Sequence, residues 1–386
     1  MHVVVFPGWY PSRVDKLSGD FIQRHMESIA LLARVSVVIP VKDKSIKKAE
    51  TVITTNGNCT EYYYYYPSRS SISWLDNFLS FVYYNYTCLK ATKGLAEKEK
   101  VDLAHLYVIQ KNHFVGLILK MLYKIPYVVS EQSTLYVDGR FEKMKGLQQA
   151  LFRYVFQHSN SFHAVSNYLL SVIKSKLQLS KEGVIIPNVV DQKLFYYNHE
   201  QVNDRVTFVH VSNMVQQKNV EGMLQAFAEV KKTNSSFLLN LVGPLPPAIS
   251  TLIKELGLSK QVIIWNERNY KEVAEIMQQS DVFVFFTRYE TFGCVIIEAN
   301  ACGLPVIVSD LDVTRELITK DFNGLFVESE NVADLAEKIL YAIENRQKFD
   351  PLVISLQTRN KFNYERISHR FLEWYSLVVK SQSAVN

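Results

Sequence analysis

The sequence predicts an α/β protein built from two doubly wound parallel sheets. Short apolar runs rich in Val, Ile and Phe alternate with stretches in which apolar residues recur at helical spacing, and this alternation continues through both halves of the chain. A length of 386 residues allows two domains, each with its own core. The composition, 48% hydrophobic and 21% charged, is that of a soluble globular protein without a membrane-spanning stretch.

The first domain is predicted to open with a β-loop-α-β unit. His2–Phe6 forms a strand, a loop that contains Gly19 follows, and Phe21–Leu32 has helical periodicity. Val35–Pro40 then reads as a buried parallel strand. The later predicted elements of this half are a tyrosine-rich strand at Glu61–Tyr66, a helix at Trp74–Lys90, strands at Asp102–Tyr107 and Tyr127–Ser130 with a helix through Lys120 between them, and further strands and turns within Ser161–Leu170 and Val184–Asp191.

The helix at Trp74–Lys90 carries aromatic residues on one face. Trp74, Phe78, Phe81 and Val82 share that face at helical spacing. We expect this face to pack into the core, and contact with a membrane interface is the alternative.

The second domain is predicted to begin after the polar stretch Asn198–Asp204, which gives domains at 1–203 and 204–361 and a C-terminal segment at 362–386. Its predicted elements are a strand at Val206–Val211, a helix at Val220–Lys231, strands at Phe237–Val242 and Val262–Trp265, and helices at Asp334–Ile343 and Tyr364–Val379. Between them lies Asp281–Ser309, the stretch that carries the clearest chemistry.

Within this stretch a strand, a turn, a helix and a second strand follow one another. Asp281–Phe286 is a short buried strand, Cys294–Ala301 is a helix that stops at a glycine and a proline, and Val306–Ser309 is the next strand. Backbone N–H groups at a helix N-terminus lack partners, so the amides of Phe292, Gly293 and Cys294 are predicted to bind an anion. Gly293 also lets a ligand approach the backbone closely.

Two glutamates flank this predicted anion site. Glu290 precedes the helix and Glu298 lies within it. Because carboxylates accept hydrogen bonds and repel phosphate, we expect them to bind sugar hydroxyls. A nucleotide sugar offers both phosphates and hydroxyls.

The segment RYETFGCVIIEANACGLPVI resembles the Glu-x7-Glu signature of retaining glycosyltransferases of the GT4 type. The resemblance extends over nearly the whole chain. It implies the GT-B fold, with two Rossmann-like domains that face a central cleft, the first on the acceptor side and the second binding the nucleotide sugar, and with the C-terminal helix crossing back to the first domain. It also implies transfer of a sugar from a UDP- or GDP-linked donor to an acceptor, with retention at the anomeric carbon and no cofactor.

The turn after Val206–Val211 resembles the family motif G-R-L-x-x-x-K-G, whose Arg and Lys grip the donor pyrophosphate. Lys218 matches the Lys, whereas Asn213 stands in the place of the Arg and follows Ser212. The resemblance therefore implies that Lys218 and the amides of the later helix stabilise the leaving phosphate, with Arg288 as another source of charge. Glu290 is expected to hold the sugar and Glu298 the ribose, so that Glu290 and Lys218 are the catalytic candidates.

Three further candidates follow from family positions. Gly19 lies in the loop that is near the donor phosphates in GT4 members, and W-Y-P-S with a later G-x-F resembles a subgroup acting in surface-polysaccharide synthesis. Gln132 stands where a histidine commonly touches the donor sugar. Arg268 lies in Asn266–Asn269, the turn that commonly reads the base. The chain lacks HExxH and CxxC spacings, so no metal site is predicted.

Charge is divided unevenly along the chain. Residues 1–200 hold 24 Lys and Arg against 16 Asp and Glu, whereas residues 201–386 hold 19 against 22. The basic first half is expected to face a phosphate-bearing glycan or lipid-linked acceptor, with peripheral contact to a membrane surface, and an ordinary solvated surface is the alternative to both. No nucleic-acid motif is present. The four scattered cysteines and the strand-like N-terminus predict a cytoplasmic location, with the inner face of the membrane as a further expectation.

Two other functions remain open from the sequence. One is a GT-B relative that epimerises or hydrolyses a nucleotide sugar. The other is a non-catalytic nucleotide-sugar binder, because Gln132 and Asn213 replace the family's His and Arg.

Overall fold

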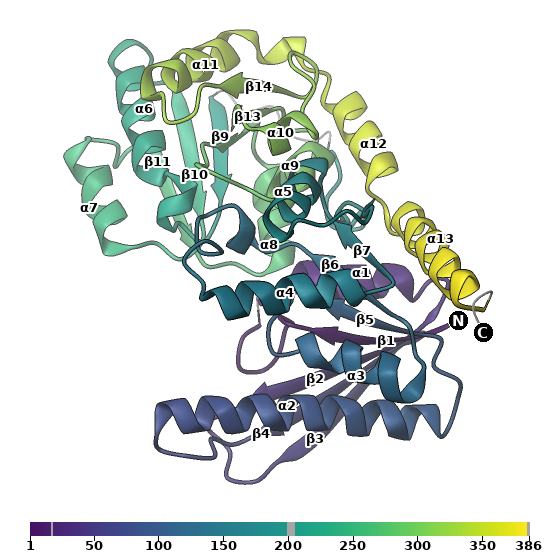
Figure 1. The fold of residues 1–386 in the computed structure, drawn as a ribbon. Coiled ribbons are helices and arrows are strands. Elements are labelled where there is room, and N and C mark those ends of the chain that lie inside the picture. The colour runs from purple at the N-terminus through teal and green to yellow at the C-terminus, as the bar shows by residue number, and fades with distance from the viewer. Residues whose placement is uncertain (17, 199–204, 384–386) are drawn as a thin grey trace. The chain divides into compact units, whose positions relative to one another are not determined.

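The computed structural model describes residues 1–16, 18–198 and 205–383, which fall into two compact units (Figure 1). Unit 1 comprises Met1–Val189 and Tyr364–Asn386, and unit 2 comprises Val190–Asn363. The expected domain boundary at 203 and 204 lies outside the described residues. Each unit has a sheet covered by helices on both faces, so the predicted fold class, two doubly wound α/β domains, is confirmed.

Unit 1 is built on an eight-stranded sheet in the order β3-β4-β2-β1-β5-β6-β7-β8. β3 is antiparallel to β4, and all other neighbouring strands are parallel. The strands are β1 (His2–Pro7), β2 (Arg34–Lys42), β3 (Glu50–Asn56), β4 (Cys59–Tyr66), β5 (Leu103–Tyr107), β6 (Tyr127–Glu131), β7 (Ser161–Ala164) and β8 (Val184–Ile185).

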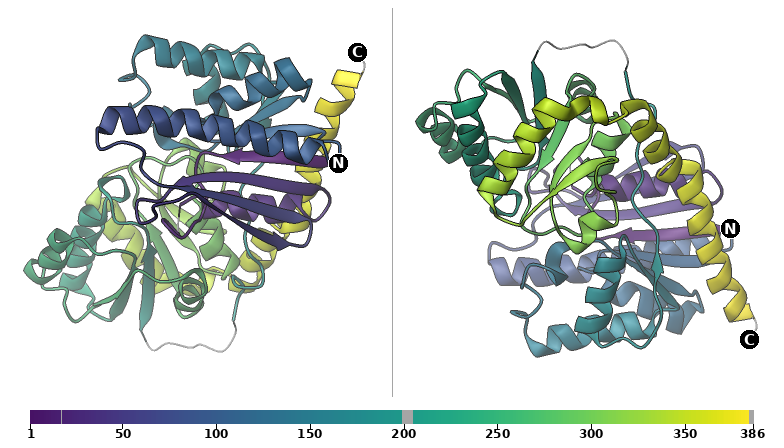
Figure 2. Two further views of the ribbon diagram at one scale, coloured as in Figure 1. Left: turned by 90° about the horizontal axis from the view of Figure 1, so that it is seen from below. Right: turned by 90° about the horizontal axis from the view of Figure 1, so that it is seen from above.

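Helices cover both faces of this sheet. α1 (Asp20–Ile29) packs against α13 (Tyr364–Ser383) on one face. The helices that succeed one another on the other face are α2 (Ser73–Ala96), α3 (His113–Tyr123), α4 (Gly146–His158) and α5 (Asn167–Leu177). Figure 2 shows α2, the longest of them, running along the strands of this unit.

Unit 2 has a fully parallel sheet in the order β11-β10-β9-β12-β13-β14. Its strands are β9 (Val206–Val211), β10 (Phe237–Val242), β11 (Val262–Asn266), β12 (Val282–Phe285), β13 (Val306–Ser309) and β14 (Gly324–Val327). Its helices are α6 (Val220–Thr233), α7 (Pro247–Glu255), α8 (Tyr270–Gln278), α9 (Cys294–Ala301), α10 (Asp312–Arg315), α11 (Val332–Asn345) and α12 (Pro351–Lys361).

The expected burial of the aromatic face of α2 is wrong. Trp74, Phe78 and Val82 are exposed, and the buried face of the helix consists mainly of small and polar residues such as Ser80 and Cys88. Periodicity correctly predicted an amphipathic helix. Three of the four side chains predicted to be buried nevertheless lie on its outer face, whereas Phe81 is half-buried and packs against Phe114. Tyr84 is a large residue on the buried face.

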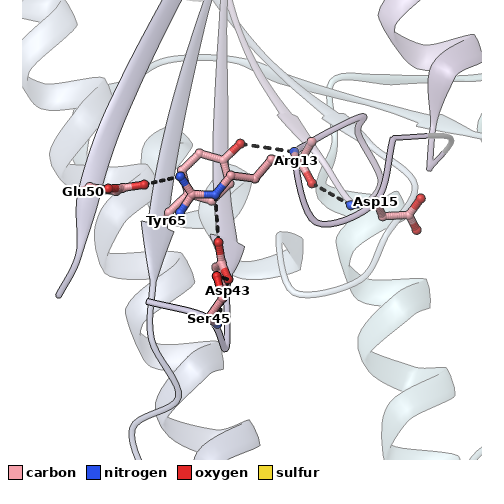
Figure 3. A network of polar contacts seen from close by, with 7 residues as sticks. Arg13, Asp15, Asp43, Ser45, Glu50 and Tyr65 are labelled. Atoms are coloured by element: carbon pink, nitrogen blue, oxygen red, sulfur yellow. Dashed lines mark hydrogen bonds and ion pairs between the residues drawn. The ribbon is translucent and has the colours of Figure 1, made fainter. Parts of the chain in front are cut away.

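The loop after β1 is tied to the edge of the sheet by Arg13, as Figure 3 shows. Its Nε donates to Asp43 at 2.8 Å, its Nη1 donates to Glu50, and its guanidinium lies 3.9 Å from the centre of the Tyr65 ring. The Ser45 hydroxyl donates to the same Asp43 carboxylate at 2.6 Å. This network fixes the loop relative to β2, β3 and β4.

A chain of buried hydrogen bonds crosses the core of unit 1. His163 Nε2 donates to the carbonyl of Ile186 at 2.6 Å, so its Nδ1 accepts from the Ser130 hydroxyl at 2.7 Å. Ser130 Oγ in turn accepts from His105 Nε2 at 2.6 Å, and His105 Nδ1 accepts from the Tyr375 hydroxyl at 2.6 Å. The chain therefore joins α13 to β5, β6 and β7, and each histidine has a defined neutral tautomer.

A third buried histidine lies beside this chain. His25 Nε2 donates to the carbonyl of Pro187 at 3.2 Å, and its ring lies 6.2 Å from that of His163. Burial lowers the pKa of His25, His105 and His163, to about 4 for His163. The core of unit 1 therefore holds three uncharged imidazoles at neutral pH.

Candidate functional site

Two turns of unit 2 are bound to each other through Gln217. One turn follows β9 and the other joins β12 to α9. The backbone carbonyl of Gln217 accepts hydrogen bonds from the backbone N–H of Arg288 at 2.8 Å and from the Thr287 hydroxyl at 3.1 Å. Its side-chain amide donates to the carbonyl of Tyr289 at 2.7 Å. The sequence did not indicate Gln217, because these contacts join residues about 70 positions apart.

This docking brings Lys218 and Glu290 together. Lys218 Nζ lies 2.7 Å from Glu290 Oε2, and the two side chains are only 14% and 11% exposed. Glu290 Oε1 accepts the backbone N–H of Thr291 at 2.9 Å. Lys218 Nζ also lies 4.8 Å from the centre of the Phe285 ring. An ammonium and a carboxylate therefore share a nearly dry position just before α9.

The start of α9 lies beside this ion pair. Gly293 has φ of 91°, and a Cβ atom there would come within 2.8 Å of Ile296 Cδ1 and 3.7 Å of Glu290 Cγ. Phe292 is buried and Cys294 is half-buried. The helix therefore begins at a left-handed glycine, with its first amides next to the Lys218–Glu290 pair.

Glu298 is held by a residue that the sequence did not indicate. Glu298 is buried, and its Oε1 accepts the hydroxyl of Tyr270 at 2.6 Å. Tyr270 begins α8 and packs against Phe195 with ring centres 4.8 Å apart. The carboxylate expected to bind ribose is thus oriented by a tyrosine next to the turn expected to read the base.

The hydroxyl of Ser212 donates its hydrogen bond to another residue of the protein. His210 Nδ1 donates to the carbonyl of Val284 at 2.8 Å, so its Nε2 accepts from the Ser212 hydroxyl at 2.8 Å. Burial lowers the pKa of His210 to about 4, so the imidazole is neutral at pH 7 and its Nε2 remains an acceptor. Ser212 Oγ also accepts the Met214 N–H at 3.0 Å, whereas Asn213 is exposed. Ser212 shapes the turn, and of the two only Asn213 presents a side chain outward.

The backbone of this turn leaves no room beside Gly243. Gly243 has φ of 134°, and a Cβ atom there would lie 1.8 Å from the carbonyl oxygen of Ser212. Gly243→Ala should therefore lower the free energy of unfolding by about 3 kcal/mol or more, measured by urea denaturation. Gly57→Ala is the control, because its φ of 55° is also left-handed but nothing lies within 4 Å of the new methyl group; its cost should be about 1 kcal/mol. Equal losses would contradict the steric argument.

The turn after β11 places Arg268 at the surface. Arg268 is exposed, lies 3.6 Å from Glu272, and its guanidinium is 5.8 Å from the centre of the Trp265 ring. Asn266 occupies the place of a frequent family glycine with φ of 54°, a left-handed conformation that asparagine tolerates. Asparagine in place of glycine therefore preserves the backbone conformation of the turn that is expected to contact the base.

Arg288 does not present an unoccupied guanidinium to the anion site. Its Nε donates to Glu330 at 2.7 Å, its Nη2 donates to Asn219 Oδ1 at 2.8 Å, and its Nη1 donates to the carbonyl of Gln216. Asn219 has φ of 47° in the position where the family motif has glycine. Arg288 therefore orders the turn that carries Lys218, and its expected role as another source of positive charge stays a prediction.

Gly19 in unit 1 has a structural reason to be glycine. Its φ is 71°, and a Cβ atom would lie 2.6 Å from the carbonyl carbon and oxygen of Trp9. The loop therefore folds back on itself at this residue. The structure brings Gly19 close to Trp9 and Tyr10, and a contact with donor phosphates stays a prediction.

Gln132 is buried beside a histidine, and its neighbour Glu131 has the more unusual environment. Gln132 Nε2 lies 3.4 Å from His25 Nδ1. Glu131 accepts the backbone N–H groups of Ile109, Gln132 and Ser133 at 3.2, 2.9 and 2.9 Å. Burial raises its pKa to about 7 despite these bonds. Glu131 thus holds the loop that presents Gln132, a role that the sequence did not reveal.

Unit 1 also contains a pocket of about 280 Å³ at the carboxyl ends of β1 and β2. Lys42 and Lys111 line it, together with Trp9, Tyr84 and the loop after β1. Lys42 pairs with Asp76, whose other oxygen accepts backbone N–H groups. Burial, and then the charge of Lys42, lower the pKa of Lys111. Asp15 also lines the pocket, so two lysines face one lining carboxylate, and the charge of Lys42 is balanced by Asp76.

A second cavity, of about 840 Å³, lies near α11 and β14 in unit 2. None of the candidate residues lines it; its lining includes Asp310, Lys320, Asp334, Lys338 and Tyr341. Within the described part of the chain, no group of three His, Cys, Asp or Glu side chains is arranged to hold a metal ion. Over the same residues, no helix is long and apolar enough to cross a membrane.

Known proteins resemble this chain in sequence and in fold. The family described as "Glycosyl transferases group 1" matches residues 196–364, and "Glycosyltransferase Family 4" matches residues 48–194. An uncharacterized glycosyltransferase of Methanocaldococcus jannaschii is 27% identical over 264 residues, which are 68% of this chain and 72% of that protein.

Two other similar proteins have more specific names. The N,N'-diacetylbacillosaminyl-diphospho-undecaprenol alpha-1,3-N-acetylgalactosaminyltransferase of Campylobacter jejuni is 24% identical over 291 residues, 70% of this chain and 76% of its own. The Anabaena protein HepE, solved in complex with UDP, shares the fold with a TM-score of 0.71 at 17% identity, over 97% of this chain and 100% of that chain. The chain therefore belongs to the glycosyltransferase group 1 family, the GT4-type enzymes with the GT-B fold.

Proposed function

We propose that the protein is a retaining, metal-independent glycosyltransferase that moves a sugar from a UDP- or GDP-linked donor to a glycan or lipid-linked acceptor in surface-polysaccharide synthesis. The observation that carries this proposal is the buried ion pair between Lys218 and Glu290 at the start of α9, with Glu298 further along the same helix. A phosphate site and two hydroxyl-binding carboxylates at one helix match the two chemical parts of a nucleotide sugar.

The barrier in such a reaction is departure of the nucleoside diphosphate while the sugar gains oxocarbenium character. Lys218 has three N–H donors, so it can keep its bond to Glu290 and also donate to a phosphate oxygen. Together with the amides at Gly293 and Cys294, it would stabilise the negative charge that grows on the leaving group. Glu290, fixed by Lys218 and the Thr291 amide, would accept hydroxyls of the sugar and orient the ring.

The nucleoside end of the donor fits the other carboxylate. Glu298 would bind the ribose hydroxyls, with Tyr270 fixing its position through the 2.6 Å hydrogen bond. Arg268 and the backbone around Asn266 lie in the turn before Tyr270 and are the candidates for contact with the base. The UDP complex of HepE supports a uridine nucleotide as the first one to test.

The acceptor is proposed to bind unit 1. Lys42 and Lys111 line a pocket there that suits a phosphate-bearing molecule. The name of the Campylobacter jejuni relative contains a diphospho-undecaprenol, which is a lipid-linked phosphate of this kind. We further propose action on the cytoplasmic side at the inner face of a membrane, since none of the four cysteines, all among the described residues, forms a disulfide.

Separate replacement of the two glutamates tests the proposal. Glu298→Ala should mainly weaken donor binding, because it removes the ribose contact, whereas Glu290→Ala should mainly lower turnover. Donor affinity is measured by thermal shift with UDP, GDP and their sugars, since a ligand at 100 times its Kd adds about 2.7 kcal/mol to the folded state. Turnover is measured by product formation with and without an added acceptor.

Two variants serve as controls for this experiment. Tyr270→Phe removes only the hydroxyl that positions Glu298 and should weaken donor binding less than Glu298→Ala does. Glu337→Ala removes an exposed carboxylate on α11 and should change neither quantity. Equal losses of affinity and turnover in both glutamate variants would refute the assigned roles, and rapid donor hydrolysis or epimerisation without acceptor would refute glycosyl transfer.

A further inference from the structure

The outer face of α2 carries a line of large apolar side chains. Trp74, Phe78, Val82 and Tyr86 are 71%, 58%, 47% and 59% exposed. They are spaced four residues apart, so each lies about 40° around the helix from the one before it, and together they cover about a third of its circumference. Lys90 continues the line one turn later, with its Nζ 6.0 Å from the centre of the Tyr86 ring. Four exposed apolar residues in register are far more than isolated surface hydrophobics.

The neighbouring helix also exposes apolar side chains. α3 packs beside α2, where Phe81 lies 5.8 Å from Phe114 between ring centres (Figure 1). At its end α3 exposes three consecutive apolar residues, Met121, Leu122 and Tyr123. We call the four residues of α2 and these three residues of α3 the α2–α3 face.

Charge on these two helices has one sign at the surface. Across α2 and α3 the sequence has a single carboxylate, Asp76, which is buried and paired with Lys42. The other charged residues of the two helices are Lys90, Lys93 and Lys120. An apolar line with Trp and Tyr that ends in lysines suits the interface of an anionic bilayer, where rings enter the headgroup layer and ammonium groups meet lipid phosphates.

The same helices lead to the pocket that Lys42 and Lys111 line. Tyr84, on the buried face of α2, and Lys111, just before α3, both line it. We propose that the α2–α3 face docks unit 1 on an anionic lipid bilayer and holds this pocket at the headgroup layer, where a lipid-linked phosphate can enter it. The delivery of an acceptor rests on the proposed function, whereas the docking itself does not.

Flotation of the full chain with lipid vesicles tests the docking. The protein should float with vesicles of phosphatidylcholine and phosphatidylglycerol, and much less with phosphatidylcholine alone or at high salt. The double variant Trp74→Ser with Phe78→Ser should lower vesicle binding about tenfold or more, because two aromatic rings are no longer transferred from water into the bilayer. Lys90→Glu with Lys93→Glu should remove the preference for phosphatidylglycerol.

Leu377→Ser is the matched control. Leu377 is an exposed apolar residue of the same unit, but it lies on α13, on the opposite face of the sheet. This variant should float like the parent protein. All replaced residues are exposed, so unchanged thermal unfolding will show that each variant is folded.

The outcomes separate docking from catalysis. Glu298→Ala should lose donor affinity and still float, and the α2 variants should lose flotation and still show a thermal shift with UDP. Undiminished flotation of the Trp74→Ser, Phe78→Ser variant would overturn the proposal. A second result would also overturn it: light scattering shows dimers that are lost in the Trp74→Ser, Phe78→Ser variant, and the parent protein does not bind vesicles. The α2–α3 face would then bind a second copy of the chain.

Discussion

Lys218→Ala should lower kcat/KM for the donor about 10²–10³-fold, the effect of removing one preorganised donor from a developing anion. The effect is large because Asn213 brings no charge and the guanidinium of Arg288 is engaged by Glu330 and Asn219. The measurement is steady-state product formation under saturating acceptor. Lys232→Ala, which removes an exposed lysine paired with Glu229, should leave kcat/KM unchanged.

The same variant should also be less stable. Alanine leaves the Glu290 carboxylate in a nearly dry site without its ammonium partner, and breaking such a pair typically costs about 3–5 kcal/mol. Adding Glu290→Gln to Lys218→Ala should recover much of this stability without recovering activity. Thermal and urea unfolding of the two variants therefore distinguish a folding defect from a catalytic one. A Lys218→Ala protein with full activity would exclude the proposed role of the lysine.

Lowering the pH from about 7 to about 5 should destabilise unit 1 by about 3 kcal/mol or more. The native pKa values of His25, His105 and His163 lie below the unfolded value of 6.5. Their stabilising contribution is therefore fully present above pH 6.5 and is lost as the pH falls, because only the unfolded chain takes up these protons. Arg24 faces His25 and Arg370 faces His163, and both positive charges act in the same direction.

Glu131 opposes this trend. Its native pKa is raised to about 7, so between pH 7 and 4.5 the folded protein holds a proton that the unfolded chain releases. These three histidines against this one glutamate leave a net uptake of about two protons on unfolding between about pH 6 and pH 5, or about 2.7 kcal/mol per pH unit. The pKa values of His2 and His113 are also lowered by burial, so both residues act in the same direction as the three histidines. Urea unfolding at several pH values, followed by tryptophan fluorescence, measures the slope, and Trp374 lies 5.5 Å from the His105 ring.

Two variants test the source of the slope. His105→Gln removes one of the three titrating groups and should reduce the slope by about 1.4 kcal/mol per pH unit. Tyr375→Phe breaks the hydrogen bond to His105 but keeps the imidazole, so it should lower stability without changing the slope. A slope that does not respond to His105→Gln would mean that the buried histidines do not set the acid sensitivity.

The elements around the site were predictable because their signals are local. The expected limits of α9 and β13 coincide with the observed ones. Gly303, which ends the helix, has φ of 86°, and a Cβ atom there would lie 2.7 Å from the carbonyl oxygen of Pro351. β3 was not predicted, because it is exposed along its whole length and shows no apolar alternation. The two-residue turn Gly57-Asn58, which joins it to β4, is the only local signal of this hairpin.

The chemistry-bearing residues were partly predictable for a related reason. Glu290, Glu298 and Lys218 stand in short motifs, so a resemblance between sequences could indicate them. Gln217 and Tyr270 act through hydrogen bonds to residues 72 and 28 positions away, and nothing in their own neighbourhood marks them. Positioning residues of this kind become visible only when the partner is known.

The sequence by itself determined the α/β class, the strand-turn-helix-strand unit at Asp281–Ser309, and the residue types at the predicted anion site, because hydrophobic periodicity, turn glycines and motifs act over a few residues. The tertiary structure alone decided that Lys218 meets Glu290, that Tyr270 orients Glu298, and that the aromatic face of α2 lies outward. Each of these three features depends on which residues, far apart in the sequence, pack against each other in the folded chain. Local sequence patterns do not specify this packing.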